Sequence, residues 1–251
     1  MSSLFSRFSQ KARDEEGSEK DIPIVQRTPS GSKIIDELLK GGYEHEIITT
    51  IYGPPGSGKT TICLQAIKSV VNMGNKAIYI DTEGGFSVER FLQLYEDNEE
   101  GMNALKMISI AKPPKFEDQK QAFLYLKEQM MPEVGILVVD SISMLYRTSL
   151  GESKDTPEVS RALSRQISLL METAQKHKIP ILITSQVYSM VDGTDKTKLY
   201  GGEFMKYASK CLIELNYDAD RKERTLQLRK HRSIPESEEK KIIIGMKGIT
   251  N

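Results

Sequence analysis

Residues 53–60 read Gly53-Pro54-Pro55-Gly56-Ser57-Gly58-Lys59-Thr60, directly after the apolar run EIITTIY (46–52) and at the start of a helical pattern over 59–73. The octapeptide has the form Gly-x-x-x-x-Gly-Lys-Ser/Thr, and ordinary residue frequencies give a chain of this length only about 0.01 such matches by chance. In a strand–turn–helix context the glycines let backbone N–H groups close around phosphate oxygens, and the helix N-terminus adds positive potential. The segment therefore predicts a phosphate-binding loop (P-loop).

The side chains of the loop predict how it would hold ATP and Mg²⁺. Lys59 is expected to reach the β- and γ-phosphates, Thr60 to place its hydroxyl on Mg²⁺, and Thr61 to add a phosphate contact. The predicted nucleotide-binding set of the loop is Gly53, Pro54, Pro55, Gly56, Ser57, Gly58, Lys59, Thr60 and Thr61. The alternative is a Gly-Pro turn with an exposed lysine, which the strand–helix context disfavours.

Short runs rich in Ile and Val continue through the chain and alternate with helical patterns. Buried strands separated by helices indicate an α/β fold, with a mostly parallel sheet covered by helices on both faces. The expected strands after 46–52 are 76–81, 107–111, 135–140 and 180–185, and the expected helices are 59–73, 87–97, 117–131 and 157–177. Beyond about residue 203, strand-like runs at 209–218, 224–231 and 240–248 predict an antiparallel β edge at the C-terminus.

The chain divides into a tail and one core domain. Residues 1–20 are polar with balanced charge and predict a flexible N-terminal tail, and residues 21–251 form the predicted ATPase core. In the tail, Leu4, Phe5, Phe8 and Ala12 fall on one face of a short helix, so the segment is either a tail with stray aromatics or a docking segment for a neighbouring subunit.

Polar residues that end three of the apolar strands predict the catalytic chemistry. Asp140 ends ILVVD and is expected to orient Mg²⁺ at the carboxyl edge of the sheet. Ser141 follows it, so the carboxylate that activates water must come from elsewhere; Glu83, just past strand 76–81, is the best candidate. Asp81 supports either Mg²⁺ or the loop. Gln186 ends PILITSQ and is expected to sense the γ-phosphate.

Composition excludes several classes of protein. The 35 basic and 35 acidic residues give zero formal net charge. This balance argues against a uniformly basic protein that coats DNA, but it is compatible with a local basic patch on the surface. Two cysteines cannot form a disulfide framework, and no apolar run approaches the roughly 20 residues of a membrane span. With no secretory signal visible, we expect a cytoplasmic protein with no membrane partner.

One basic segment suggests contact with DNA. Residues 221–232 (RKERTLQLRKHR) carry six Lys or Arg against one Glu, and Lys196, Lys198, Lys206 and Lys210 lie within or just after the segment 187–200. Such cations suit phosphate-led, weakly sequence-specific DNA binding that salt weakens. The alternative is a solvated, charged hairpin.

The P-loop, DTEGGFSVERF (81–91), ILVVD (136–140) and ILITSQ (181–186), in this order, resemble the RecA/RadA recombinase superfamily. The resemblance covers nearly all of 30–251, including DSISMLYRTS (140–149) and SQVYSMVDG (185–193). GGFSVERF and KHRSIPE (230–236) are most similar to the archaeal RadB group, as is the lack of room for a preceding helix-hairpin-helix domain. The resemblance implies a RecA-like P-loop NTPase core.

The resemblance also implies roles for individual residues. Glu83 would be the catalytic carboxylate, Asp140 the Mg²⁺-orienting acid and Gln186 the γ-phosphate sensor. Arg90 would pack on adenine, and Pro235 would cover the nucleotide of an adjacent subunit. Residues 148–156 and 187–200 would be the two DNA-facing loops. We further expect His231 or Arg232 to offer positive charge to a neighbour's nucleotide.

Departures from the strand-exchange pattern decide the functional expectation. The first loop lacks the arginine flanked by glycines that strand-exchange proteins carry, and the second is several residues shorter than theirs. The sequence therefore predicts an ATP-binding, DNA-binding accessory protein of DNA repair and homologous recombination, with weak ATPase activity. Expected partners are DNA, further copies of the chain, and a RadA-type recombinase or junction-processing nuclease. The alternatives are a true RadA-type recombinase, a KaiC-like ATP-dependent regulatory oligomer without a DNA role and, less favoured, a small-molecule kinase.

Overall fold

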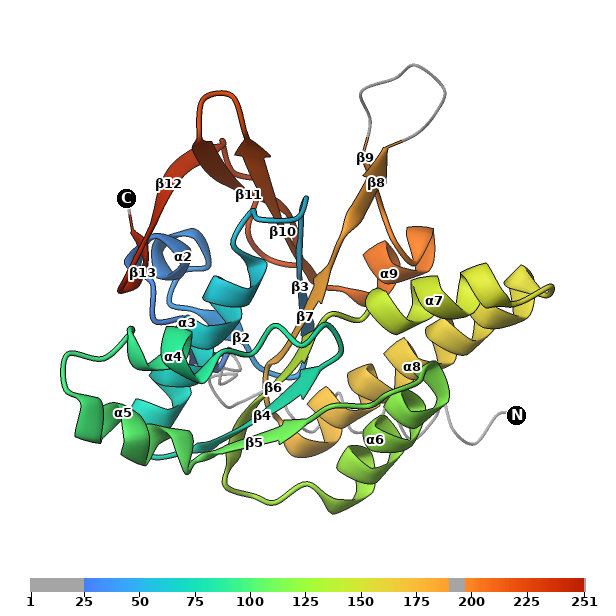
Figure 1. Ribbon diagram of the computed structural model, residues 1–251, viewed down its shortest axis with the longest axis horizontal. Helices are drawn as coiled ribbons and strands as arrows, with labels where there is room; N and C mark the ends of the chain where they lie inside the picture. The colour runs from blue at the N-terminus through green and yellow to red at the C-terminus, as the bar shows by residue number, and fades with distance from the viewer. Residues whose placement is uncertain (1–24, 190–196, 251) are drawn as a thin grey trace, which may run out of the picture.

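A nine-stranded sheet forms the centre of the computed structural model, which describes residues 25–189 and 197–250 (Figure 1). The strand order is β13-β12-β11-β10-β3-β7-β6-β4-β5. The five predicted core strands are all present and parallel: β3 (Ile48–Tyr52), β4 (Lys76–Asp81), β5 (Ile108–Ala111), β6 (Val134–Asp140) and β7 (Ile181–Ser185). The α/β fold with a mostly parallel sheet is therefore confirmed.

Two hydrophobic cores lie on opposite faces of this sheet. Ile136 and Val138 of β6 belong to one core, and Leu137 and Val139 belong to the other, as the alternation of side chains along a strand requires. One face is covered by α2 (Lys33–Leu38), α3 (Lys59–Asn72), α4 (Val88–Leu92) and α5 (Asn98–Leu105). The other is covered by α6 (Phe116–Gln129), α7 (Met144–Glu152), α8 (Thr156–His177) and α9 (Gly202–Ala208). A sheet buried on both faces explains why its strands are continuously apolar.

Two expectations about helices need correction. The helix predicted over 87–97 is shorter, since α4 ends at Leu92. A further helix, α5, begins beyond the predicted span, where the Asp97 side chain accepts hydrogen bonds from the backbone N–H groups of Glu99 and Glu100. The first expected DNA-facing loop, 148–156, is mostly helical. Helix α7 continues to Glu152, and Asp155 caps α8 by accepting from the Glu158 N–H, which leaves only a short link between them.

The C-terminal strands form the antiparallel edge, with β10 (Cys211–Asp218) as the transition. This strand runs parallel to β3 and antiparallel to β11 (Glu223–His231), and β12 (Lys240–Gly245) and β13 (Gly248–Thr250) complete the edge. Strand β13 packs on the helix of the P-loop, where the buried Gln65 side chain accepts a hydrogen bond from the Ile249 N–H at 2.9 Å. The edge strands therefore reach back to the predicted nucleotide site.

Two short ribbons complete the described structure. Strands β1 (Arg27–Thr28) and β2 (Tyr43–Glu44) pair near α2, and β8 (Val187–Ser189) and β9 (Thr197–Leu199) pair at the base of the second expected DNA-facing segment. Within the described ranges, no helix is long and apolar enough to cross a membrane. The predicted tail, residues 1–20, lies outside the described residues, as does Lys196.

Candidate nucleotide-binding site

The P-loop connects β3 to α3 as the sequence predicts, and its glycines are sterically required. A Cβ atom on Gly53 would lie 2.1 Å from the backbone oxygen of Leu215. Gly58 has a φ of +108°, and a Cβ atom there would lie 2.3 Å from Ile244 Cδ1. A side chain at Gly53 would collide with backbone, whereas at Gly58 the Ile244 side chain could move and the positive φ is what favours glycine.

The lysine and the serine of the loop are both suited to an anion. Lys59 Nζ donates to the carbonyl oxygens of Gly53 at 2.9 Å and Pro54 at 2.8 Å, so the ammonium group lies within the curve of the loop. Burial lowers the pKa of Lys59, while the nearby charges of Asp140 and Glu83 act in the opposite direction. Ser57 Oγ is buried and has no hydrogen-bond partner among the described residues. A phosphate group would supply a partner for both side chains.

Asp140 lies at the end of β6 and accepts three side-chain hydrogen bonds. Its Oδ2 accepts from Thr60 Oγ1 and from the Tyr79 hydroxyl, each at 2.6 Å, and its Oδ1 accepts from Thr184 Oγ1. Burial, followed by the charge of Asp140, raises the pKa of Tyr79 far above its usual value, so the phenol remains a donor. The Thr60 hydroxyl and the Asp140 carboxylate together offer the hard oxygen ligands that Mg²⁺ prefers.

Glu83 lies beyond β4 and contacts residues from two other strand ends. Its Oε1 accepts from Ser141 Oγ at 2.5 Å, and Gln186 Nε2 lies 3.3 Å from Oε1 and 3.4 Å from Oε2. The structure therefore brings the three predicted polar strand ends, at 83, 140 and 186, into one site.

Asp81 contacts the loop that carries Glu83. It accepts hydrogen bonds from the backbone N–H groups of Gly85 at 2.9 Å and Phe86 at 3.2 Å, and it lies 3.6 Å from Lys112 Nζ. Of the two roles left open by the sequence, these contacts favour support of the loop. They explain how the chain after β4 holds Glu83 toward the P-loop.

These residues surround a cavity of about 370 Å³. Its lining includes Arg224 and Ile244, which sequence reasoning did not assign to the site. Arg224 Nε donates to the Gly56 carbonyl at 3.2 Å, and its guanidinium stacks 4.3 Å from the Tyr217 ring centre. The sequence signal for Arg224 was only its place in a basic run, which does not reveal that β11 passes beside the P-loop.

Arg90 and Pro235 lie outside the lining of this cavity. Arg90 Nη2 donates to the Gly245 carbonyl at 2.7 Å and Nη1 to the Met246 carbonyl at 3.0 Å, so the side chain supports the β12–β13 turn. Pro235 is exposed in the segment between β11 and β12. Their expected contacts with the base of a nucleotide stay predictions.

The expectation for His231 is wrong. Its imidazole is 2% exposed and lies 3.5 Å from the carboxylate of Glu44, which is itself 1% exposed. Arg27, at 3.8 Å, and Arg232 also pair with Glu44. A buried carboxylate needs positive or hydrogen-bonding partners, and this requirement holds His231 inside its own chain.

The basic segment 221–232 is mostly occupied by contacts within the chain. Arg221 pairs with Asp218, Arg229 with Glu214 and Arg232 with Glu44. Lys230 Nζ donates to the carbonyls of Lys206 and Ser209, and Arg224 contacts the P-loop. The structure therefore favours the alternative of a charged hairpin over a DNA-binding patch for this segment.

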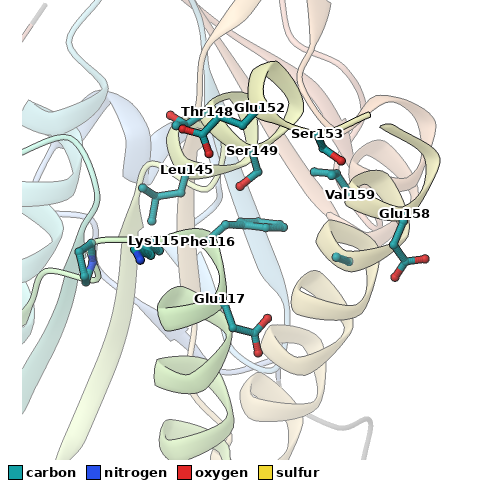
Figure 2. A pocket seen from close by; sticks show the side chains of 12 residues that line it. Lys115, Phe116, Glu117, Leu145, Thr148, Ser149, Glu152, Ser153, Glu158 and Val159 are labelled. Carbon is teal, nitrogen blue, oxygen red and sulfur yellow. The ribbon is translucent and has the colours of Figure 1, made fainter. Parts of the chain in front are cut away.

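A larger hollow, of about 750 Å³, lies away from these residues, between the N-terminal ends of α6 and α8 and one side of α7. Figure 2 shows the Phe116 ring in the middle of it and the acidic side chains of Glu117 and Glu158 at its margins. Glu117 pairs with Lys120, and Glu158 pairs with Arg161 and Arg165. It contains none of the predicted nucleotide-binding residues, so the smaller cavity is the candidate site.

Comparison with known proteins agrees with this arrangement, since a model of the Rad51 family matches residues 23–251. The chain belongs to the Rad51 family. It is 37% identical over 217 residues to the DNA repair and recombination protein RadB of Methanococcus maripaludis strain C5, covering 86% of this chain and 96% of that one. RadB of Methanoculleus marisnigri is 40% identical over 216 residues, covering 84% and 92% of the two chains.

A solved structure gives the same answer for the fold. The crystal structure of the RadB recombinase matches with a TM-score of 0.76 and 33% identity, over 89% of this chain and 99% of that one. The resemblance and the RecA-like fold predicted from the motifs are confirmed. The chain is a RadB-like DNA repair and recombination protein, and the RadA-type and KaiC-like alternatives are disfavoured. Membership of the Rad51 family implies nucleotide and Mg²⁺ dependence, DNA interaction and oligomerisation in general terms.

Proposed function

We propose that this protein binds ATP and Mg²⁺ in the cavity at the P-loop, hydrolyses ATP slowly, and assists DNA recombination through phosphate-led DNA binding. The observation that carries the proposal is the convergence of Lys59, Thr60, Glu83, Asp140 and Gln186 on one cavity. The P-loop and Lys59 supply positive potential for the phosphates, and Ser57 Oγ offers a buried polar group to them.

Thr60 and Asp140 would hold Mg²⁺, which when bound neutralises charge on the phosphate oxygens. Glu83 would accept a proton from the attacking water, because it lines the same cavity as the P-loop residues. Ser141 and Gln186 donate to Glu83, which keeps the carboxylate oriented. Among the described residues, the one contact of Oε2 is the 3.4 Å approach of Gln186 Nε2, so this oxygen keeps acceptor capacity for a water molecule.

Self-association would complete the site. In a single subunit the cavity is open to solvent, and water weakens the electrostatic stabilisation of developing charge. Strand β5 is an edge strand of the sheet, and beside it lies an apolar groove. Ile110, Tyr125 and Met131 of this groove are 41%, 64% and 46% exposed. We infer that a second copy of the chain covers this groove, and that a RadA-type recombinase or a junction-processing nuclease is a further partner.

The direct test is ATP binding by calorimetry in the presence of Mg²⁺, followed by single-stranded DNA binding over a salt series. Lys59→Ala should lose most nucleotide affinity, because the variant removes the buried charge partner of the phosphates. Lys33→Ala is the matched control, since Lys33 is 89% exposed on α2 and does not line the cavity. Unchanged ATP affinity in a folded Lys59→Ala variant would contradict the proposal.

A further inference from the structure

Arg224, on β11, lines the cavity at the P-loop and keeps most of its hydrogen-bond donors for a ligand. Its Nε donates to the Gly56 carbonyl at 3.2 Å, and its guanidinium carbon lies 4.3 Å from the centre of the Tyr217 ring. Within the described ranges, its two Nη groups donate to no acceptor, and these groups carry most of the N–H donors of an arginine. The guanidinium is therefore oriented by the protein and still able to bind an anion.

Arg224 also differs in charge pairing from the other arginines of the segment 221–232. Each of those three pairs with a carboxylate of the chain: Arg221 with Asp218, Arg229 with Glu214 and Arg232 with Glu44. No carboxylate of the described residues pairs with Arg224, so its positive charge is not neutralised locally and attracts an anion more strongly. The arginine of this segment that reaches the cavity is thus the one without an acidic partner in the described structure.

The sheet order brings Arg224 to the P-loop from the side opposite the carboxylates. Strands β10 and β11 lie on one side of β3, and β7, β6 and β4 lie on the other (Figure 1). The second group of strands leads to Gln186, Asp140 and Glu83, respectively. A phosphate chain in the cavity would therefore have the carboxylates on one side and Arg224 on the other.

Tyr217 holds the guanidinium in this position. It lies directly opposite Arg224 in the β10–β11 pair, where cross-strand side chains are in contact, and a cation over an aromatic ring is attracted to it. Strand β10 itself is close to the loop, since a Cβ atom on Gly53 would lie 2.1 Å from the Leu215 backbone oxygen. A guanidinium that stacks on a ring keeps N–H donors at its edge, where they can contact a phosphate.

We propose that Arg224 is a nucleotide-binding residue that contacts the phosphate chain shared by ATP and ADP, and that Tyr217 is its positioning residue; the inference rests on the proposed function. Arg224 lies across the P-loop from Glu83 and Gln186, which are proposed to act at the γ-phosphate. It therefore binds the phosphates equally before and during hydrolysis, and such a contact raises affinity without raising turnover. Loss of Arg224 raises KM for ATP and leaves kcat close to the wild-type value.

Calorimetry with ATP and with ADP, each with Mg²⁺, tests this contact. Arg224→Gln is the informative variant, because its amide can still donate to the Gly56 carbonyl while the positive charge is lost. We expect its affinity for both nucleotides to fall about ten-fold or more and to depend less on ionic strength than that of the wild type. Arg224→Lys, which keeps the charge, should restore part of the affinity. Phosphate release at saturating ATP should show kcat within about two-fold of the wild type for both variants.

Variants of Tyr217 test the positioning role. Tyr217→Phe keeps the aromatic face and should bind both nucleotides as the wild type does. Tyr217→Leu removes that face and should weaken ATP and ADP binding by the same factor, about two-fold or more. Unchanged affinity in Tyr217→Leu would overturn the positioning role.

Arg221→Ala is the matched control. The Arg221 side chain is 77% exposed just before β11 and does not line the cavity, so this variant also removes one positive charge and should keep the wild-type affinities. The inference is overturned if Arg224→Gln binds both nucleotides as tightly as the wild type, if it loses affinity for ATP alone, or if it lowers kcat with unchanged affinity. A wild type that binds no nucleotide overturns the proposed function itself, so the two failures are distinguishable.

Discussion

Thr60 donates its hydroxyl hydrogen to Asp140 across 2.6 Å, although the two residues are 80 positions apart in the chain. This bond joins the first residues of α3 to the end of β6, and Tyr79 and Thr184 donate to the same carboxylate from the neighbouring strands β4 and β7. The proposed Mg²⁺ ligands are therefore oriented by hydrogen bonds that exist within the protein alone.

Asp140→Asn should weaken both metal dependence and stability. The amide that replaces one carboxylate oxygen cannot accept a hydrogen bond, so a donor among Thr60, Tyr79 and Thr184 loses its acceptor. A buried polar group left without its partner costs about 1–3 kcal/mol, which urea unfolding would detect. ATP affinity measured against Mg²⁺ concentration should become less dependent on the metal.

Tyr79→Phe is the matched control for that variant. It removes one donor to Asp140 and leaves the carboxylate intact, so the expected loss is about 1 kcal/mol of stability with the metal dependence retained. If Tyr79→Phe abolishes the Mg²⁺ dependence as fully as Asp140→Asn does, Asp140 acts through the hydrogen-bond network and the assignment of a metal role to its carboxylate is wrong.

Glu83→Gln should preserve ATP binding and reduce turnover by about 100-fold or more, the range associated with loss of a general base. The amide keeps the shape of the side chain but cannot accept a proton. Steady-state phosphate release and calorimetric ATP affinity together check this expectation. Ser141→Ala, which removes the 2.5 Å hydrogen bond to Glu83 and a 3.4 Å contact with Ser143, should alter turnover much less. Wild-type hydrolysis by Glu83→Gln would show that another group activates the water.

Much of the candidate site could be predicted because its signals are local. The P-loop is one contiguous motif, and Glu83, Asp140 and Gln186 each follow an apolar strand, where parallel strands present their carboxyl ends at one edge. The hydrogen-bond donors to Asp140 on the neighbouring strands were not predicted, because their positions depend on how the strands are aligned in the sheet. Tyr79 lies opposite Val138 across the β4–β6 pair, and Thr184 lies near the end of the neighbouring β7, neither of which the sequence specifies.

The remaining differences arise from long-range packing. Arg224 and Ile244 reach the P-loop only because the C-terminal strands fold back along the sheet edge. His231 was expected to reach a neighbouring subunit because it lies on an edge strand, whereas the buried carboxylate of Glu44 holds it inside. The start of the additional helix α5 depends on the cap at Asp97, a local signal that could have been read from the sequence.

Stability should fall as the pH falls below the ordinary histidine pKa of about 6.5. Burial lowers the pKa of His231, with Arg27, Arg232 and Lys40 acting in the same direction and Glu44 against it, and burial also lowers the pKa of His45. Above pH 6.5 both histidines are neutral in the folded and unfolded states. Below it the unfolded chain binds protons that the folded chain does not, so unfolding becomes more favourable.

Thermal melts between pH 7.5 and 5.5 would measure this dependence. His231→Gln and His45→Gln should each flatten the curve of melting temperature against pH, and the double variant should flatten it further. The third histidine, His177, remains in every variant and provides a constant background. A curve of the double variant as steep as that of the wild type would assign the acid sensitivity to other groups.

Self-association through the groove beside β5 should control hydrolysis. Ile110→Glu places a charge on an exposed apolar side chain at the edge of the sheet, where a second copy would have to desolvate it. Sedimentation velocity should show the variant at a smaller size than the wild type at equal concentration, and its specific ATPase activity should no longer rise with protein concentration. Met73→Glu on the P-loop helix's far end, also an exposed apolar site at 56%, is the control.

Strand exchange by the purified protein alone should be absent or poor. The link between α7 and α8 is short, and Glu152 and Asp155 bracket it with acidic charge, so the first expected DNA-facing segment offers little positive potential. Several cations of the C-terminal hairpin are paired within the chain. Few of its cations are therefore left to bind the phosphates of DNA and separate the two DNA strands. A strand-exchange assay with short oligonucleotides is run with and without a RadA-type recombinase. It measures exchange by the protein alone and stimulation of exchange by the recombinase. Accessory function predicts stimulation of the partner and little product alone. Efficient exchange without the partner would instead establish a recombinase whose DNA contacts form only on assembly.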